Sequence, residues 1–186
     1  MTDTSDDIDQ EFQDILAAVG REDRADAVRR AVSAYEGGLE HPLIFILAAE
    51  GFEADGRIDE AIALLRQATE EAPEGAEGWR RLGGALARHG QPAEARKALE
   101  IALGIDPNIY WTQYMAGVVC GQMNDLDAAE GYYRRAAAVD PAQPEPRAAL
   151  EAIAQYRQTL AESSAPPRTW GLKFQVSPPS GGQRLN

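Results

Sequence analysis

Several residue types recur along this chain at one fixed spacing, and this period constrains the fold more than any other feature. Proline recurs every 34 residues, at Pro73, Pro107 and Pro141. Alanine recurs in two registers seven residues apart, at Ala61, Ala95 and Ala129 and at Ala68, Ala102 and Ala136. A large apolar residue stands between the two alanines of each pair, at Leu65, Leu99 and Tyr133. A turn-forming residue precedes each pair, at Gly56, Gly90 and Asn124. A fixed period between roughly 20 and 50 residues is typical of stacked supersecondary units.

Each register has a physical reason. Gly or Asn after a helical stretch accepts the left-handed conformation that ends a helix. Two alanines seven residues apart lie on one helix face, where a methyl group lets a neighbouring helix approach closely. Proline cannot continue a helix, and it pushes the residue before it out of helical geometry. Each unit is therefore predicted to be a helix, a tight turn, a second helix and a stop.

The first helices carry the matching half of the pattern. Trp79, Leu82 and Gly83 stand at W-x-x-L-G spacing, and Gly117 repeats Gly83 after one period. A glycine at this place removes a side chain where two helices would otherwise collide. With these residues the chain resembles the tetratricopeptide-repeat family over residues 42–143. The resemblance implies an all-α fold, an α-α superhelical solenoid of helical hairpins with full repeats at 42–75, 76–109 and 110–143.

Two departures from the family pattern are mild. The first repeat has Ala49 at the place of Gly83, and the third has Gln113 at the expected aromatic place, with the tryptophan displaced to Trp111.

The flanks read as degenerate continuations. Residues 8–41 are predicted to form two helices, 8–19 and 25–35, joined by a loop through Gly20 and Asp23 that runs two residues longer than in later repeats. Residues 144–162 are predicted to be a capping helix, because repeat stacks need a polar outer face at their ends. About seven or eight helices are expected in all, after a disordered acidic start at residues 1–7.

Composition and charge exclude several classes of protein. The net charge of −12 argues against a nucleic-acid partner, which needs a basic surface. The longest apolar run, Leu43 to Ala49, is too short to cross a membrane, so no membrane insertion is expected. Cys120 is the only cysteine, and the polar start has no signal pattern, which favours a cytoplasmic location. The 16 arginines against 2 lysines are associated with a GC-rich genome, and a bacterial source is expected.

No catalytic, cofactor or metal site is predicted, and the chain is not expected to be an enzyme. The two histidines, His41 and His89, have no suitably spaced ligand partners. Cys120 falls on the inner face of a first helix, where a buried structural thiol is expected. Gly83 and Gly84 lie inside a helical pattern instead of opening a helix after a strand, so they do not indicate a phosphate loop.

The resemblance implies a concave groove, lined by the first helices, that binds extended or helical peptides. The residues at matching places are Leu43, Ile46, Glu50, Arg80, Arg88, Trp111, Tyr114, Val118 and Gln122. Some family members grip a peptide carboxylate with a Lys/Asn/Lys/Arg clamp, and the corresponding places here lack it. We expect Trp111 and Tyr114 to anchor an extended apolar peptide with some acidic character, whereas Leu43 and Ile46 could equally pack against the preceding helices.

The repeat pattern stops after Ala161. Residues 163–186 are rich in Pro, Gly and Ser, and within 168–176 the apolar residues Trp170, Leu172, Phe174 and Val176 alternate with small or polar ones. Such alternation is typical of an extended segment with one apolar face. All 30 acidic residues precede position 163, whereas Arg168, Lys173 and Arg184 follow it. This tail is predicted to dock on the repeat body of its own chain, or of a neighbour in a homodimer formed by tail exchange.

The leading functional hypothesis is a cytoplasmic adaptor or assembly chaperone that binds a protein or peptide partner. Three alternatives stay open at this point. The chain could be a type III secretion chaperone-like peptide holder, the N-terminal regulatory domain of a larger enzyme, or a self-assembling structural protein.

Overall fold

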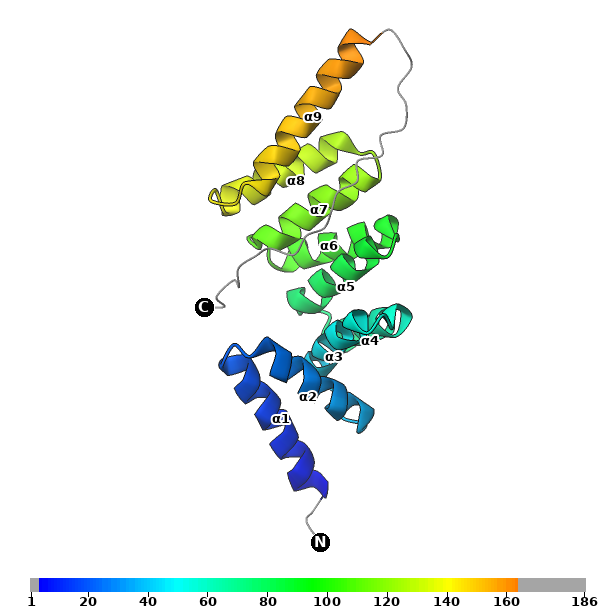
Figure 1. The fold of residues 1–186 in the computed structure, drawn as a ribbon, viewed down its shortest axis with the longest axis vertical. Coiled ribbons are helices and arrows are strands. Elements are labelled where there is room, and N and C mark those ends of the chain that lie inside the picture. Colours follow the sequence, from blue (N-terminus) through cyan, green and yellow to red (C-terminus); the bar gives the residue numbers. More distant parts are fainter. Residues whose placement is uncertain (1–3, 164–186) are drawn as a thin grey trace.

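The structure, a computed structural model, describes residues 4–163 and the side chains of residues 10–163. This part of the chain holds nine α-helices and no strand (Figure 1). The helices are α1 (Thr4–Gly20), α2 (Arg24–Glu36), α3 (Pro42–Ala54), α4 (Ile58–Glu71), α5 (Ala76–Arg88), α6 (Pro92–Ile105), α7 (Tyr110–Gln122), α8 (Leu126–Val139) and α9 (Glu145–Glu162). The predicted all-α solenoid is confirmed. The expected total of seven or eight helices was too low, because the predicted N-terminal pair, three hairpins and capping helix together already make nine.

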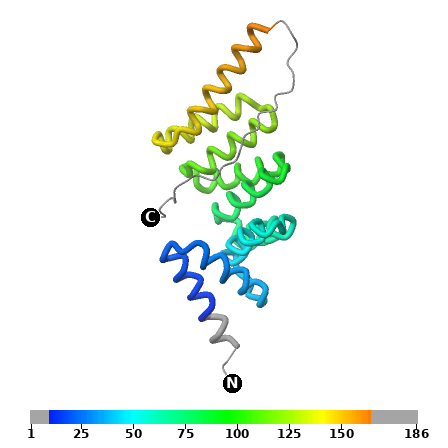
Figure 2. Tube along the Cα trace, in the orientation of Figure 1, coloured from blue at the N-terminus to red at the C-terminus, as the bar shows by residue number. Residues whose placement is uncertain are grey.

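The helices form four hairpins stacked in chain order, α1–α2, α3–α4, α5–α6 and α7–α8, and α9 packs on α8 (Figures 1 and 2). The first helices of successive hairpins also contact one another, α3 with α5 and α5 with α7. They therefore form a continuous layer, which is the part of the fold that matters for binding.

The turn within each hairpin is set by one residue with positive φ. Gly56 and Gly90 have φ 76° and Asn124 has φ 60°, which confirms the left-handed turns predicted from the repeat register. Glu22 stands one repeat period before Gly56 and has φ 59°. The α1–α2 connection is therefore only three residues long, like the others, and the prediction of a longer loop was wrong. Few residues other than Gly and Asn adopt this conformation, so a glutamate at this position does not indicate a turn in the sequence.

The small residues of the repeat sit where helices approach most closely. A Cβ atom on Gly83 would lie 2.6 Å from Leu99 Cγ, and one on Gly117 would lie 2.7 Å from the Tyr133 ring. Both contacts are shorter than carbon atoms allow, which confirms the predicted collision between the helices of a hairpin. Ala102, like the alanines that repeat it, is fully buried.

The buried apolar residues form three clusters along the stack. The first joins α1, α2 and α3 around Ile15 and Ile44. The second, here called the central core, joins α3 to α7 around Phe45 and Leu86. The third, the C-terminal core, joins α7, α8 and α9 around Tyr133 and Ile153.

The two ends of the described chain differ in part from expectation. Helix α1 begins at Thr4, within the stretch predicted to be disordered, and acidic residues near a helix N-terminus interact favourably with its dipole. Helix α9 is fixed to α8 by Arg157, whose guanidinium contacts Asp127 at 2.6 Å and Glu130 at 2.5 Å. The predicted docking segment 168–176 lies outside the described residues.

Candidate functional site

The candidate site is the layer formed by the first helices of the hairpins. We call the side of this layer that carries Glu50 and Glu53 of α3, Glu77, Arg80 and Arg88 of α5, and Trp111 and Tyr114 of α7 the first-helix face. Glu77 and Arg80 of α5 are followed one repeat later by Trp111 and Tyr114 of α7, so stacking of the repeats places all four on this side. Leu43 instead packs in the cluster of α1, α2 and α3. Ile46 is half-buried against the central core. Leu43 and Ile46 therefore have packing roles, and Trp111 and Tyr114 also pack in part against the central core and the C-terminal core.

Charged side chains cross-link the N-terminal half of the face. The carboxylate of Glu50 on α3 accepts hydrogen bonds from Arg24 Nε on α2 and from Arg81 Nη1 on α5, each at 3.0 Å. Arg81 Nε also donates to Glu77 at 2.8 Å, and Arg80 Nε donates to the same carboxylate at 2.8 Å. The five residues form one chain of alternating charge across three helices, here called the ion-pair chain.

The pKa values in the ion-pair chain follow from its contacts. Partial burial raises the pKa of Glu50, but the guanidinium groups of Arg24 and Arg81 more than offset this, so its pKa is lowered. The pKa of Glu77 is lowered in the same way, by Arg80 and Arg81 against burial. Both carboxylates are therefore ionised at neutral pH.

A second ion pair closes the same half of the face. Arg88 on α5 contacts Glu53 on α3 at 2.7 Å, and His89 Nε2 lies 3.4 Å from the same carboxylate. A recess of about 10 Å³, room for about one water molecule, lies between Glu50, Glu53 and Arg81. The charged side chains of this half of the face are thus largely engaged with one another.

Aromatic rings occupy the C-terminal half. The Tyr114 ring is tilted against Trp111 at a centroid distance of 5.8 Å, stacks on Tyr110 at 6.1 Å, and touches Tyr133 at 5.8 Å. Trp111 and Tyr114 are half-buried, whereas Tyr110 and Tyr133 are buried. Trp111 and Tyr114 are therefore brought together, and each keeps an exposed part.

Two carboxylates, those of Glu145 and Asp140, lie near this aromatic group. Tyr110 Oη donates to Glu145 at 3.3 Å. Burial raises the pKa of Tyr110, and the charges of Glu145 and Asp140 raise it further. The pKa of Tyr114 is raised by burial and by Glu145. Both phenols are therefore neutral hydrogen-bond donors at any physiological pH.

The remaining predicted residues are placed as follows. Gln122 is exposed at the end of α7. Val118 is only 1% exposed and belongs to the C-terminal core, so it presents no surface to a ligand. The sequence did not indicate that Arg24 and Arg81 belong to the site. Their contacts with Glu50 depend on how one hairpin is rotated against the next, and the repeat spacing does not specify this rotation.

The lone cysteine and the potential metal ligands of residues 10–163 are placed as follows. Burial raises the pKa of Cys120 to about 11, which keeps this thiol protonated and unreactive. No group of three or more potential ligands gathers in the described part of the chain. Over the same range no helix is long and apolar enough to cross a membrane.

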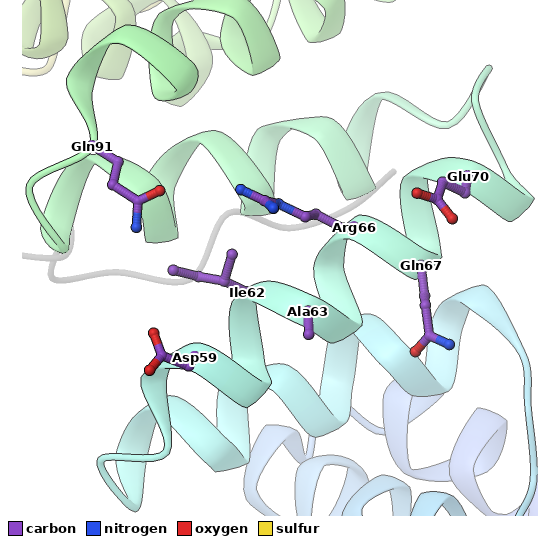
Figure 3. A pocket seen from close by; sticks show the side chains of 7 residues that line it. All are labelled: Asp59, Ile62, Ala63, Arg66, Gln67, Glu70 and Gln91. Carbon is purple, nitrogen blue, oxygen red and sulfur yellow. The ribbon is translucent and has the colours of Figure 1, made fainter.

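A cavity of about 380 Å³ lies away from the first-helix face, along the outer side of α4 and at the start of α6 (Figure 3). Its walls include Asp59, Ile62, Arg66 and Gln91. Arg66 is already paired with Glu94 at 2.7 Å. These side chains do not converge on one point as a catalytic group would, so the first-helix face remains the better candidate.

Comparison with known proteins agrees with this geometry. A sequence profile described as tetratricopeptide repeat matches residues 46–108, and another with the same description matches residues 112–143. Among curated proteins, no sequence matches this chain.

Solved structures with the same fold share little sequence with the chain. A MamA variant superposes with a TM-score of 0.72 at 14% identity, covering 86% of this chain and 93% of its own. The first repeat domain of Spaghetti (RPAP3), bound to an HSP90 peptide, gives a TM-score of 0.61 at 19% identity and covers 63% and 93%. The corresponding human RPAP3 domain gives 0.61 at 19%, covering 66% and 96%. At these identities the likeness concerns the fold.

Proposed function

This chain belongs to the tetratricopeptide-repeat family, and on that premise we propose that it is a non-catalytic scaffold that binds an extended peptide on its first-helix face. The observation that carries the proposal is the pair Trp111 and Tyr114, two half-buried rings in contact that each keep an exposed part on the face that the repeats align. Aromatic side chains of this kind are the usual energetic centres of protein interfaces. The HSP90 peptide bound by the RPAP3 domain supports the same use of the fold.

The charges of the face favour an apolar ligand with at most a few acidic groups. Arg24, Arg80, Arg81 and Arg88 face the three carboxylates of Glu50, Glu53 and Glu77, which leaves one positive charge in excess. Because every one of these guanidinium groups already has a carboxylate partner, an acidic ligand would have to displace an internal ion pair. The aromatic half offers contact area without that cost.

We infer that the scaffold acts as an adaptor or assembly chaperone in the bacterial cytoplasm. The excess of arginine over lysine is associated with GC-rich genomes, which many bacteria have. The buried free thiol of Cys120 is compatible with a reducing compartment.

The test is selection of peptides from a random displayed library on the full chain, followed by affinity measurement on the selected peptides. We expect enrichment of sequences with alternating apolar residues. Trp111→Ala should weaken binding by about 30-fold or more, as for a central anchor residue. Arg66→Ala in the α4 cavity is the matched control and should leave the affinity unchanged.

A thermal melt separates binding from folding. If Trp111→Ala unfolds the protein, Trp111→Leu preserves apolar contact with the central core while removing the ring. Full binding by a folded Trp111→Leu variant, or equal loss in the Arg66 control, would contradict the proposed site.

A further inference from the structure

We propose that residues 168–176 of this chain bind its own first-helix face at α7, over Trp111 and Tyr114, and so compete with the partner peptide. The inference rests on the proposed function, since it names the internal occupant of the same site. Three observations carry it: the pattern of the segment, the unpaired acidic groups beside the rings, and the reach of the chain beyond α9.

The segment has the chemistry that the aromatic half of the face would select. In an extended strand, residues two apart share one side, so Trp170, Leu172, Phe174 and Val176 form a single apolar edge. Thr169, Gly171, Lys173 and Gln175 form the other edge. An apolar edge of this kind pairs with the exposed parts of the two half-buried rings, because removing large apolar side chains from water is favourable.

Charge also directs the segment to this end of the stack. Within residues 10–163, Glu145 accepts a hydrogen bond from the neutral Tyr110 hydroxyl, and Asp140 accepts bonds from Ala142 N and Gln143 Nε2. Neither carboxylate has a cation within ion-pair distance in the described part of the chain. The carboxylates of the ion-pair chain, in contrast, are already engaged by arginines. The charged residues after position 163 are all basic.

The reach of the chain fits this docking position. Leu150 and Tyr114 both pack against the C-terminal core, and Leu150 precedes Ser163 by 13 residues, about 20 Å along helix α9. Trp170 follows Ser163 by seven residues, which span at most about 23–25 Å. A chain that turns back along α9 can therefore place Trp170 beside Tyr114. The next residues then extend toward Trp111, one helical turn earlier in α7.

The first experiment compares amide hydrogen exchange at residues 168–176 between the full chain and an isolated peptide of residues 163–186. Docking should slow exchange in the full chain by about tenfold or more, since a bound segment exchanges only when it opens. Equal, fast exchange in both samples would overturn the proposal.

Matched variants of the full chain test which edge docks. Trp170→Ala with Phe174→Ala removes the apolar edge and should abolish the protection. Thr169→Ala with Gln175→Ala changes the opposite edge and should preserve it. Protection that survives the first pair, or that is lost equally with both, would overturn docking through the apolar edge.

The molecular mass in solution tests whether the tail binds the first-helix face of its own chain or that of a second copy. A monomer by light scattering, with protection that does not change on dilution, supports docking within one chain. A dimer whose protection falls on dilution would overturn it in favour of tail exchange between two chains. Failure of tail docking leaves the proposed function standing, because the library selection and the Trp111 variants do not depend on the tail.

Discussion

The side-chain amide of Gln113 donates to the carbonyl oxygen of Pro107 at 2.9 Å. One repeat earlier, the indole Nε1 of Trp79 donates to the carbonyl oxygen of Pro73 at 2.8 Å. Gln113 therefore replaces the aromatic residue expected at its place but keeps the same hydrogen bond. In both repeats this bond joins the proline that ends one hairpin to the first helix of the following hairpin. Arg135 on α8 orients the amide by donating to its oxygen at 3.1 Å.

Gln113→Met should destabilise the protein by about 1–2 kcal/mol, because methionine has a similar length but cannot donate to the Pro107 carbonyl. For a chain of this size the melting temperature should fall by about 2–8 °C. Gln122→Met is the matched control on the same helix, at an exposed position, and should leave the melting temperature unchanged. Equal melting of both variants would mean that the Pro107 bond contributes nothing.

Gly117→Ala should destabilise the third repeat by about 1–3 kcal/mol, since the added methyl group would lie 2.7 Å from the Tyr133 ring. Adding Tyr133→Leu should recover part of the loss, because the first repeat pairs Ala49 with Leu65 at the same two places. The control is Gly104→Ala, which has open space around the new methyl group and should be stabilising by about 0.5–1 kcal/mol through helix propensity. Chemical denaturation of the four proteins measures each difference.

Tyr133→Phe should preserve or increase stability. The Tyr133 hydroxyl is fully buried and has no hydrogen-bond partner in the described part of the chain. A buried hydroxyl without a partner costs about 1–3 kcal/mol, and phenylalanine removes that cost while retaining the ring contacts with Gly117 and Tyr114. A clear loss of stability in denaturant unfolding would show that the hydroxyl is satisfied in solution, by a bound water for example.

The local parts of this fold could be predicted from sequence, and the contacts between repeats could not. The turns at Gly56, Gly90 and Asn124 follow from residue chemistry within a few positions. The turn at Glu22 does not, because a glutamate there adopts a conformation that its type disfavours. The ion pair between Glu50 and Arg81 depends on the rotation of one hairpin against the next, which no spacing encodes. The exposure of Trp111 and the burial of Val118 depend on the same rotation.

The ion-pair chain makes the stability of the folded protein depend on pH in the acid range. Partial burial raises the pKa of Glu50 in the folded state, but Arg24 and Arg81 outweigh burial, so the pKa is lowered from an ordinary value of 4.5. The folded state therefore binds fewer protons, and the stability contributed by ionised Glu50 is complete above the unfolded pKa and is lost as the pH falls through the folded one. Stability should decline as the pH is lowered from about 5 to about 3.

Glu50→Gln separates this residue from the other carboxylates. Because its side chain is about one-third exposed, we expect only about 0.5–1 kcal/mol of destabilisation at neutral pH. The difference from the unmodified protein should shrink as the pH falls, since the wild-type carboxylate is then protonated as well. Glu151→Gln on α9 is the matched control, because Glu151 has no ion-pair partner within residues 10–163. Urea unfolding across this pH range measures both variants, and a pH-independent difference for Glu50→Gln would show that the Arg24 and Arg81 contacts do not stabilise the charged form.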